Sequence, residues 1–405
     1  MANKKVRIGI IGCGNMGSAH FNNILANKCP EIEVTAIADI NPKRLEWAEK
    51  AANDAKVKYP ERADEILVPT MFSDASEMIK SGLIDAVIVS VPHYSHPTYV
   101  MEAMENGLHA MCEKPAGVYT LQVREMMACA DRHPDLKFGM MFNQRTTPVY
   151  RKMKEIIESG ELGAIRRTSW MVTGWYRPQA YYDSGAWRAT WSGEGGGVLL
   201  NQCPHNLDLW QWICGMPVLV DAKLHYGKWH DIEVEDDVTT YVEYANGATG
   251  TFITSTGDAP GTNRFEIVCD GGTLYCDGGS LYLTKLEMPE PEFSRTNTVA
   301  FAQPKNERIK VECTGENNQH VGVLNAFAAA ILRGEPMLAD GREGINGLTI
   351  SNAMHLSSWL GHAVEIPFDE ELFKEELFKR VKTSRRKEAV EAVFSDTTGS
   401  YNVVK

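Results

Sequence analysis

The chain has 405 residues, of which 41 are basic and 53 acidic, and its formal net charge is −12. Its 43% hydrophobic and 23% charged residues are typical of a globular protein, and the length predicts two or three domains. An acidic surface repels phosphate backbones and anionic membranes, so neither nucleic acid nor a membrane is an expected partner.

Cysteine usage and the first residues indicate a compartment. The nine cysteines are scattered and never spaced as Cys-x-x-Cys, which argues against a disulfide framework or a cysteine zinc site. The apolar run at residues 6–11 contains Arg7 and is too short for a signal peptide, and no apolar stretch is long enough to span a bilayer. A cytoplasmic location is therefore expected.

The first third of the chain alternates short β-branched runs with helical patterns. Strand then helix, repeated, predicts a doubly wound parallel sheet with helices on both faces, here over residues 1–145. Residues 53–69 fit this alternation poorly and are expected to form a loop or short helix. The predicted strands are Val6–Ile11, Val34–Ala38, Ala86–Val91 and Lys137–Phe142, and the predicted helices are Arg44–Asp54, Pro97–Asn106 and Leu121–Arg132.

A second α/β domain is predicted over residues 146–405, with a charged C-terminal extension. Alternating apolar and polar residues with turns at Asn246-Gly247 and Gly271-Gly272 predict successive antiparallel strands. The predicted strands are Asp237–Tyr244, Ala248–Ser255, Asn263–Cys269 and Thr273–Tyr275, and the predicted helices are Val149–Ser159, Val321–Arg333, Arg342–Trp359 and Glu370–Val381.

A glycine-rich segment, Gly12-Cys13-Gly14-Asn15-Met16-Gly17, joins the first predicted strand to a helix. Gly12 permits a tight turn, Gly14 lets backbone amides approach a pyrophosphate, and Gly17 permits close contact between helix and strand. Asp39 follows Gly17 by 22 residues, where a carboxylate would hold the adenosine ribose. Without a ligand the same residues would form only a tight turn.

Asp39 also indicates which dinucleotide binds. Its charge repels a 2′-phosphate and favours NAD over NADP, although Lys43 and Arg44 lie close behind and weaken that preference. The residues predicted to contact the cofactor are Gly12, Gly14, Asn15, Met16, Gly17, Asp39, Ser90, Pro92, His93, His96, Glu113 and Lys114.

Cys112-Glu113-Lys114-Pro115 follows a predicted strand, at the sheet edge where open α/β sheets bind ligands. Partial burial there could lower the pKa of Lys114, which could then donate a proton to, or accept one from, a carbonyl or hydroxyl. The alternative is a surface Glu–Lys pair at a turn.

Several motifs together resemble the Gfo/Idh/MocA oxidoreductases, the glucose–fructose oxidoreductase and inositol dehydrogenase superfamily. They are the glycine segment, Pro92–His96, Glu113-Lys114-Pro115 and Gly195–Asp208, which resembles the family's GGG-x-L-x-D-x-G-x-H-x-x-D signature. With His320–Gly334 and Asp340-Gly341, the resemblance covers residues 5 to about 365.

The resemblance implies a Rossmann domain followed by an α/β domain with an open, mostly antiparallel sheet, which commonly packs against its copy. A homodimer or homotetramer is expected. The implied chemistry is hydride transfer between nicotinamide and a hydroxyl carbon of a sugar or cyclitol. Lys114 would contact the reacting hydroxyl, and His205 would complete proton transfer.

The chain departs from the family pattern at three positions. Asn201 stands where Asp is usual, Cys203 replaces Gly, and His93 replaces Asn. An amide cannot act as a base, so Asn201 is expected to orient a substrate hydroxyl, and proton transfer then depends on His205 and Lys114. His205 could instead be a structural histidine on an apolar helix. His205-x-x-Asp208 lacks further ligands placed with it, so no metal is expected.

The segment from Trp170 to Trp191 is rich in aromatic residues interleaved with two arginines. Aromatic faces and guanidinium groups suit the C–H faces and hydroxyls of a sugar, although some of these rings are expected to be core or dimer contacts. The amount of aromatic surface suggests a glycoside with an aglycone. The predicted substrate-binding residues are Lys114, Asn143, Arg145, Tyr176, Trp187, Arg188, Asn201 and His205.

The sequence thus predicts an NAD-dependent sugar or glycoside dehydrogenase, with oxidation at the sugar C3 as the preferred regiochemistry by analogy. Two alternatives belong to other classes. One is a redox-assisted glycoside-cleaving enzyme that recycles its bound NAD, and the other is a non-catalytic NAD-binding regulator. The presence of both Lys114 and His205 argues against the regulator.

Overall fold

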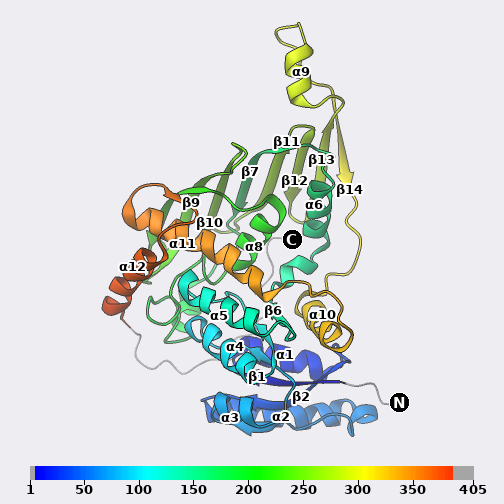
Figure 1. The fold of residues 1–405 in the computed structure, drawn as a ribbon, viewed down its shortest axis with the longest axis vertical. Coiled ribbons are helices and arrows are strands. Elements are labelled where there is room, and N and C mark those ends of the chain that lie inside the picture. Colours follow the sequence, from blue (N-terminus) through cyan, green and yellow to red (C-terminus); the bar gives the residue numbers. More distant parts are fainter. Residues whose placement is uncertain (1–4, 386–405) are drawn as a thin grey trace. The chain divides into compact units, whose positions relative to one another are not determined.

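The computed structural model describes residues 5–385, which form two compact units (Figure 1). Among the described residues, the first unit holds those up to Thr146 together with Asn318–Ile345, and the second holds Thr147–Asn317 and those that follow Ile345. The predicted second domain, 146–405, included residues 318–345, which the structure groups with the first unit. The end of the predicted charged extension lies outside the described residues.

The first unit contains a six-stranded sheet in which every neighbouring pair is parallel. Its order is 3-2-1-4-5-6, the arrangement of doubly wound dinucleotide-binding sheets. This confirms the predicted fold class. The strands are β1 (Val6–Ile11), β2 (Ile32–Ala38), β3 (Thr70–Phe72), β4 (Ala86–Val89), β5 (His109–Cys112) and β6 (Phe138–Met140).

Helices cover this sheet, and one of them comes from late in the chain. Phe21, Ala48 and Phe327, from α1, α2 and α10, are buried in one cluster with β1 and β2, which explains why residues 318–345 group with the first unit. Of residues 53–69, expected to form a loop or short helix, the first six continue α2, and a 3₁₀ turn follows at Pro60–Arg62. The helices are α1 (Asn15–Leu25), α2 (Pro42–Lys58), α3 (Ala75–Lys80), α4 (His96–Glu105), α5 (Thr120–Arg132) and α10 (Gln319–Arg333).

The second unit is built on a nine-stranded sheet of order 14-13-12-11-7-10-9-8-15. All neighbouring strands are antiparallel except β7 and β10, so the mostly antiparallel sheet is confirmed. The strands are β7 (Ile165–Val172), β8 (Leu219–Tyr226), β9 (Glu235–Glu243), β10 (Thr249–Ser255), β11 (Asn263–Cys269), β12 (Gly272–Asp277), β13 (Ser280–Leu286), β14 (Asn306–Val311) and β15 (Val364–Glu365).

Helices of the second unit gather on one face of this sheet, where α6, α8 and α11 lie in front of the strands in Figure 1. A short helix, α9, projects beyond the end of β13 and β14. The helices are α6 (Pro148–Glu158), α7 (Gln179–Asp183), α8 (Pro204–Cys214), α9 (Glu290–Thr296), α11 (Gly344–Leu360) and α12 (Glu370–Thr383).

The sheet's core face follows from strict alternation along its central strand β7. Thr168, Trp170 and Val172 are buried, whereas Arg167 and Met171 are exposed, as the two-residue period of a strand requires. The Trp170 ring stacks on Phe265 with centroids 4.2 Å apart. Its indole nitrogen donates to Asn263 Oδ1 over 2.9 Å, which satisfies the one polar atom that burial would leave unpaired.

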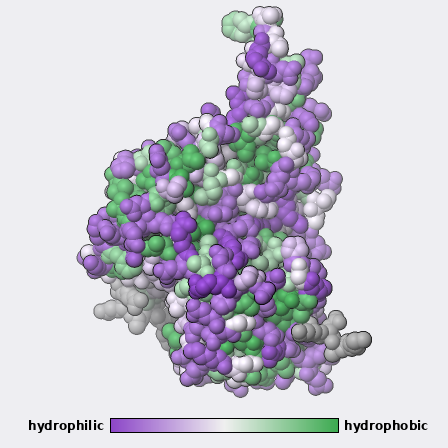
Figure 2. Space-filling view, viewed as in Figure 1, coloured by the Kyte–Doolittle hydropathy of each residue, from purple (hydrophilic) through white to green (hydrophobic). Residues whose placement is uncertain are grey.

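Hydrophilic residues make up most of the molecular face drawn in Figure 2, in keeping with the charged composition. Within residues 5–385, no helix combines the length and the apolar character that crossing a membrane requires.

Replacing Trp170 with Ala should lower the free energy of unfolding by about 3–5 kcal/mol, because a large buried ring is lost and a cavity remains. Arg167→Ala, on the exposed face of the same strand, should change it by no more than about 0.5 kcal/mol. Urea unfolding measured by circular dichroism checks both values. Equal losses in the two variants would contradict the assignment of the faces.

Candidate active site

The glycine segment forms the tight turn that the sequence predicts, and each of its glycines lies in a different steric environment. Gly12 has φ +86°, and a Cβ there would lie 2.5 Å from the carbonyl oxygen of Ser90. A Cβ on Gly17 would lie 2.0 Å from the carbonyl oxygen of Gly12, so α1 reaches the turn only without a side chain. Gly14 instead has no atom within 4 Å of its hypothetical Cβ. Its side of the turn is open.

The Asp39 carboxylate is held in place by two backbone amides. Its Oδ2 accepts from Cys13 N over 2.7 Å and its Oδ1 accepts from Asn41 N over 2.8 Å. The end of β2 is thereby joined to the glycine turn, and the negative charge is fixed where the ribose was predicted. Of the two cations behind it, Lys43 is exposed and Arg44 is buried.

These residues fit a bound dinucleotide. Gly14 leaves room for a pyrophosphate beside the first amides of α1, a helix whose N-terminus has no side-chain cap. Two buried polar atoms, Ser90 Oγ and Asn143 Oδ1, lack a hydrogen-bond partner among residues 5–385. Buried polar atoms normally have partners, so both are suited to a ligand's polar groups.

Lys114 follows a buried carboxylate that anchors its backbone. Glu113 is 4% exposed, its Oε2 accepts from Lys114 N over 3.2 Å, and its Oε1 accepts from His20 Nε2 over 2.7 Å. The His20 and His320 rings meet edge to face with centroids 5.5 Å apart. Lys114 therefore stands next to a fixed acid–imidazole pair at the carboxyl end of β5.

Burial opposes ionisation of Glu113. The hydrogen bond from His20 and the charges of His20, His320 and Lys114 nevertheless lower the pKa of Glu113 to about 2. Burial, with the neighbouring His20, lowers the pKa of His320 to about 4. Near neutral pH the cluster thus holds an ionised Glu113 and a neutral His320.

His96 braces the predicted nucleotide site. Its ring nitrogens lie 2.6 Å from the Pro115 carbonyl oxygen and 2.8 Å from that of Val91, and burial lowers its pKa. The ring thus ties the end of β4 to the turn after Lys114. His93 is also buried and lies in the 3₁₀ turn His93–Ser95, with its ring centroid 5.9 Å from that of His96.

Asn143 and Arg145, both predicted to bind substrate, differ in their surroundings. The Asn143 amide donates to Gln319 Oε1 over 2.5 Å. Arg145 is 1% exposed, and its guanidinium forms an ion pair with Glu343 at 2.8 Å. The contacts of Asn143 and Arg145 with substrate remain predictions.

In the second unit, a buried carboxylate holds the glycine-rich segment that precedes Asn201 and His205. Glu235, with no exposed surface, accepts from Gly197 N at 2.8 and 2.9 Å and from Leu199 N at 3.0 Å. His355 Nε2 lies 3.0 Å from the same carboxylate. A Cβ on Gly197 would lie 2.0 Å from the Glu235 carbonyl oxygen, so this glycine is needed for the close approach.

His205 is 3% exposed and occupies the first turn of α8. Cys203, the departure from the usual glycine, is buried with its sulfur 3.2 Å from Thr254 Oγ1. Asp208 accepts from Gln211 Nε2 over 3.2 Å. Over residues 5–385, no group of three or more His, Cys, Asp or Glu side chains is arranged to hold a metal ion.

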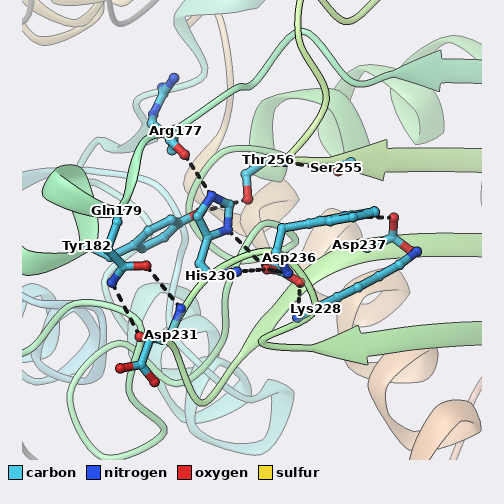
Figure 3. A network of polar contacts seen from close by, with 12 residues as sticks. Arg177, Gln179, Tyr182, Lys228, His230, Asp231, Asp236, Asp237, Ser255 and Thr256 are labelled. Carbon is cyan, nitrogen blue, oxygen red and sulfur yellow. Dashed lines mark hydrogen bonds and ion pairs between the residues drawn. The ribbon is translucent and has the colours of Figure 1, made fainter.

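A polar network contacts the middle of the aromatic segment (Figure 3). His230 reaches the Arg177 carbonyl oxygen at 2.8 Å and Asp236 at 3.0 Å, and Tyr182 donates to Thr256 Oγ1 over 2.7 Å. Asp236 also accepts from the backbone amides of Lys228, Trp229 and His230 at 2.8–3.1 Å. The loop before β9 and the helix α7 are thereby joined.

The aromatic residues of this segment divide by burial, as the sequence analysis expected for some of them. Tyr176 is 47% exposed. The Arg188 guanidinium lies over the rings of Tyr181 and Trp187, 4.6 and 4.7 Å from their centroids, and donates to Tyr181 Oη over 2.9 Å. The remaining four rings are buried and structural, namely Trp170, Trp175, Tyr182 and Trp191.

The sequence predicted no role for the residues that hold the candidate site residues and their loops in place, namely His20, His320, Glu194, His230, Glu235, Asp236 and His355. Some of their partners are distant in sequence, as Glu113 is from His20, and the near ones lie in irregular segments, so spacing alone gives no signal. Two weak signals were present. Glu235, Asp236 and Asp237 form an acidic run at the start of a strand, and His20 lies three residues after Gly17 on the following helix.

Two family models and a solved structure match most of the chain. Residues 6–139 match the oxidoreductase family with an NAD-binding Rossmann fold, and residues 150–275 match the GFO/IDH/MocA C-terminal domain. The WlbA dehydrogenase from Bordetella pertussis, solved in complex with NADH and UDP-GlcNAcA, superposes with a TM-score of 0.74 at 25% identity, covering 91% of this chain and 100% of that one.

Two curated relatives match at lower coverage. The uncharacterized oxidoreductase YrbE of Bacillus subtilis is 26% identical over 216 residues, 53% of this chain and 55% of that protein. Inositol 2-dehydrogenase of Corynebacterium glutamicum is 24% identical over 250 residues, 60% of this chain and 65% of that protein. The chain therefore matches between about half and two thirds of the length of these relatives.

Alanine at two of the glycines should affect different properties. Gly17→Ala should affect the stability of the fold, and Gly14→Ala should affect NAD binding. Gly17→Ala should lower the free energy of unfolding by about 1–3 kcal/mol, because its Cβ meets the Gly12 carbonyl. Gly14→Ala should leave apo stability within about 0.5 kcal/mol and weaken NAD binding at least tenfold, because its Cβ enters the open side of the turn. Thermal unfolding and NAD titration check both; unchanged affinity in Gly14→Ala would contradict the cofactor placement.

Protonation of His320 should make the folded state less stable as the pH falls. The unfolded chain binds a proton with a pKa near 6.5, whereas the folded pKa is about 4, so stability decreases as pH falls through that window. His320→Asn should reduce the stability lost between pH 7 and pH 5 by about 2 kcal/mol. Urea unfolding at both pH values measures this, with exposed His362→Asn as control. An unchanged slope would contradict the pKa assignment.

Proposed function

The chain belongs to the Gfo/Idh/MocA oxidoreductase family, and we propose that it is an NAD-dependent dehydrogenase moving a hydride between nicotinamide and a hydroxyl carbon of a sugar or glycoside. The observation that carries the proposal is the position of Lys114. It follows β5 at the same sheet edge as the glycine turn, and the Glu113–His20 pair holds its backbone. A proton-handling group at this edge is suited to a substrate beside the nicotinamide.

The cofactor proposal assigns one task to each element of the first unit. The open side of Gly14 and the first amides of α1 would hold the pyrophosphate, and Asp39 would accept from the ribose hydroxyls. The fixed charge of Asp39 disfavours a 2′-phosphate, which supports NAD over NADP. Bound NAD would supply the hydride acceptor in oxidation and the hydride donor in reduction.

The protein's own residues would handle the proton. Lys114 Nζ would hydrogen-bond the reacting hydroxyl, and the His205 imidazole would take its proton as the C–H bond breaks. In the reverse direction the same groups would return the proton to a keto-sugar. Asn201, as an amide, would orient a hydroxyl rather than act as a base.

A sugar or glycoside is favoured by the exposed part of the aromatic segment. Tyr176, Trp187 and Arg188 retain solvent access, and their combination of ring faces and guanidinium donors suits a pyranose. The relatives named above include an inositol dehydrogenase and a dehydrogenase complexed with a nucleotide sugar acid. Within this class we propose a glycoside oxidised at C3.

The direct test is a screen of methyl glucosides, nitrophenyl glucosides, free sugars and inositols with NAD and NADP, followed by NADH absorbance. Reduction of NAD by at least one compound is expected, with NADP weaker. Release of nitrophenol without net NADH would instead support redox-assisted glycoside cleavage. No reduction by any polyol, together with no oxidation of NADH by keto-sugars, would contradict the proposal.

Lys114→Ala and His205→Asn should each lower kcat about 100- to 10,000-fold, the range for loss of a proton-transfer group. In His205→Asn, NAD affinity should remain within about threefold. The control variants Lys305→Ala and His362→Asn alter exposed residues and should retain activity. Steady-state kinetics and NAD titration measure these effects, and full activity in either site variant would remove that residue from the mechanism.

A further inference from the structure

Glu194 is a buried carboxylate next to Asn201, the position where the family signature usually has Asp. Its side chain is 3% exposed, and it precedes the three glycines at 195–197. Its Oε2 accepts from Ala189 N over 2.6 Å, and its Oε1 accepts from the Asn201 side-chain amide. The sequence separation of seven residues concealed this pairing, because neither residue lies in a regular helix.

The contact determines which way the Asn201 amide faces. A carboxylate only accepts hydrogen bonds, so Asn201 must present its NH₂ to Glu194 and direct its carbonyl oxygen away from it. Donation to an ionised acceptor also polarises the amide and strengthens its carbonyl as an acceptor. Asn201 is thereby fixed as an acceptor, the role that an ionised Asp has at the same position.

We propose that Glu194 supplies the negative charge that is missing at position 201, and that the Glu194–Asn201 pair presents a fixed acceptor to a substrate hydroxyl. Glu194 acts through Asn201 and is a positioning residue. The proposal rests on the proposed function, because it assumes that Asn201 contacts the sugar.

The surroundings support a role for charge beyond loop packing. Arg188 Nη1 lies 4.0 Å from Glu194 Oε1, so a cation faces the carboxylate from the segment proposed to bind substrate. A buried carboxylate is costly to desolvate, and a neutral Gln could satisfy Ala189 N equally well. A Gln at 194 would then turn its NH₂ toward Asn201 and reverse the Asn201 amide. The negative charge of Glu194 sets the orientation of the Asn201 amide, whereas the hydrogen bond to Ala189 N does not require a charge.

Exchanging the carboxylate at position 194 with the amide at position 201 tests the proposal. Glu194→Gln should lower kcat/KM about 10- to 100-fold, as expected for losing a hydrogen bond that involves an ionised group. Asn201→Asp should place two carboxylates together, so activity should fall more steeply with rising pH than in the wild type. The double variant E194Q/N201D again pairs one carboxylate with one amide, and its kcat/KM should return to within about fivefold of the wild type.

A readout without turnover separates this proposal from the proposed function. In protein labelled with ¹⁵N-asparagine, the Asn201 NH₂ signal is identified by its loss in N201D. It should shift clearly in E194Q and remain in place in the control Glu292→Gln, which alters an exposed residue of α9. Thermal unfolding and NAD titration confirm that each variant is folded.

An unmoved Asn201 signal in E194Q would overturn the proposal, as would a kcat/KM within twofold of the wild type. A double variant whose kcat/KM is no higher than that of the less active single variant would also overturn it. If Glu194 were merely structural, the two substitutions would lower kcat/KM additively in free energy. If the wild type converts no sugar, the proposed function fails while the amide signal still decides whether the pair exists.

Discussion

Carboxylates that accept hydrogen bonds from backbone amides hold several of the irregular segments on which the proposed chemistry depends. Asp39 binds the amide of Cys13 in the glycine turn, and Glu235 binds those of Gly197 and Leu199. Glu194 binds Ala189, and Asp236 binds the amides of residues 228–230. Loops lack the ladder hydrogen bonds of helices and sheets, so their amides need other acceptors. Ionised acceptors give the stronger bonds.

Glycine is needed in both units where two backbone segments approach each other closely. Gly197 approaches the Glu235 carbonyl so closely that a Cβ cannot fit. Gly17 approaches Gly12 in the same way. Gly14 has no such contact, which separates the glycine suited to a ligand from the glycines required by packing.

Much of the fold could be predicted from the sequence because hydrophobic periodicity is local. Val6–Ile11 and Asn263–Cys269 are strands with the predicted limits. The three-residue strand β3 is too short and too exposed to produce a pattern. The grouping of α10 with the first unit depends on contacts between Phe327 and residues some 300 positions earlier, which periodicity cannot reveal.

The candidate site could be predicted only where a motif carried it. Lys114, His205 and Asp39 lie in motifs, and the structure positions Asp39 and Lys114 through backbone contacts. Their assigned roles remain predictions. Arg145 follows a strand end as a ligand-binding residue would, and its buried guanidinium pairs with the half-exposed Glu343. The partner Glu343 lies 198 residues later, and composition near Arg145 gives no sign of it.

The central claim is that a hydride passes directly from a sugar carbon to the nicotinamide. Its most direct measurement is mass spectrometry of the NADH formed from a substrate deuterated at all its carbon positions. The account predicts NADH one mass unit heavier than that formed from the unlabelled substrate. NADH of ordinary mass, formed from the deuterated substrate, would contradict it.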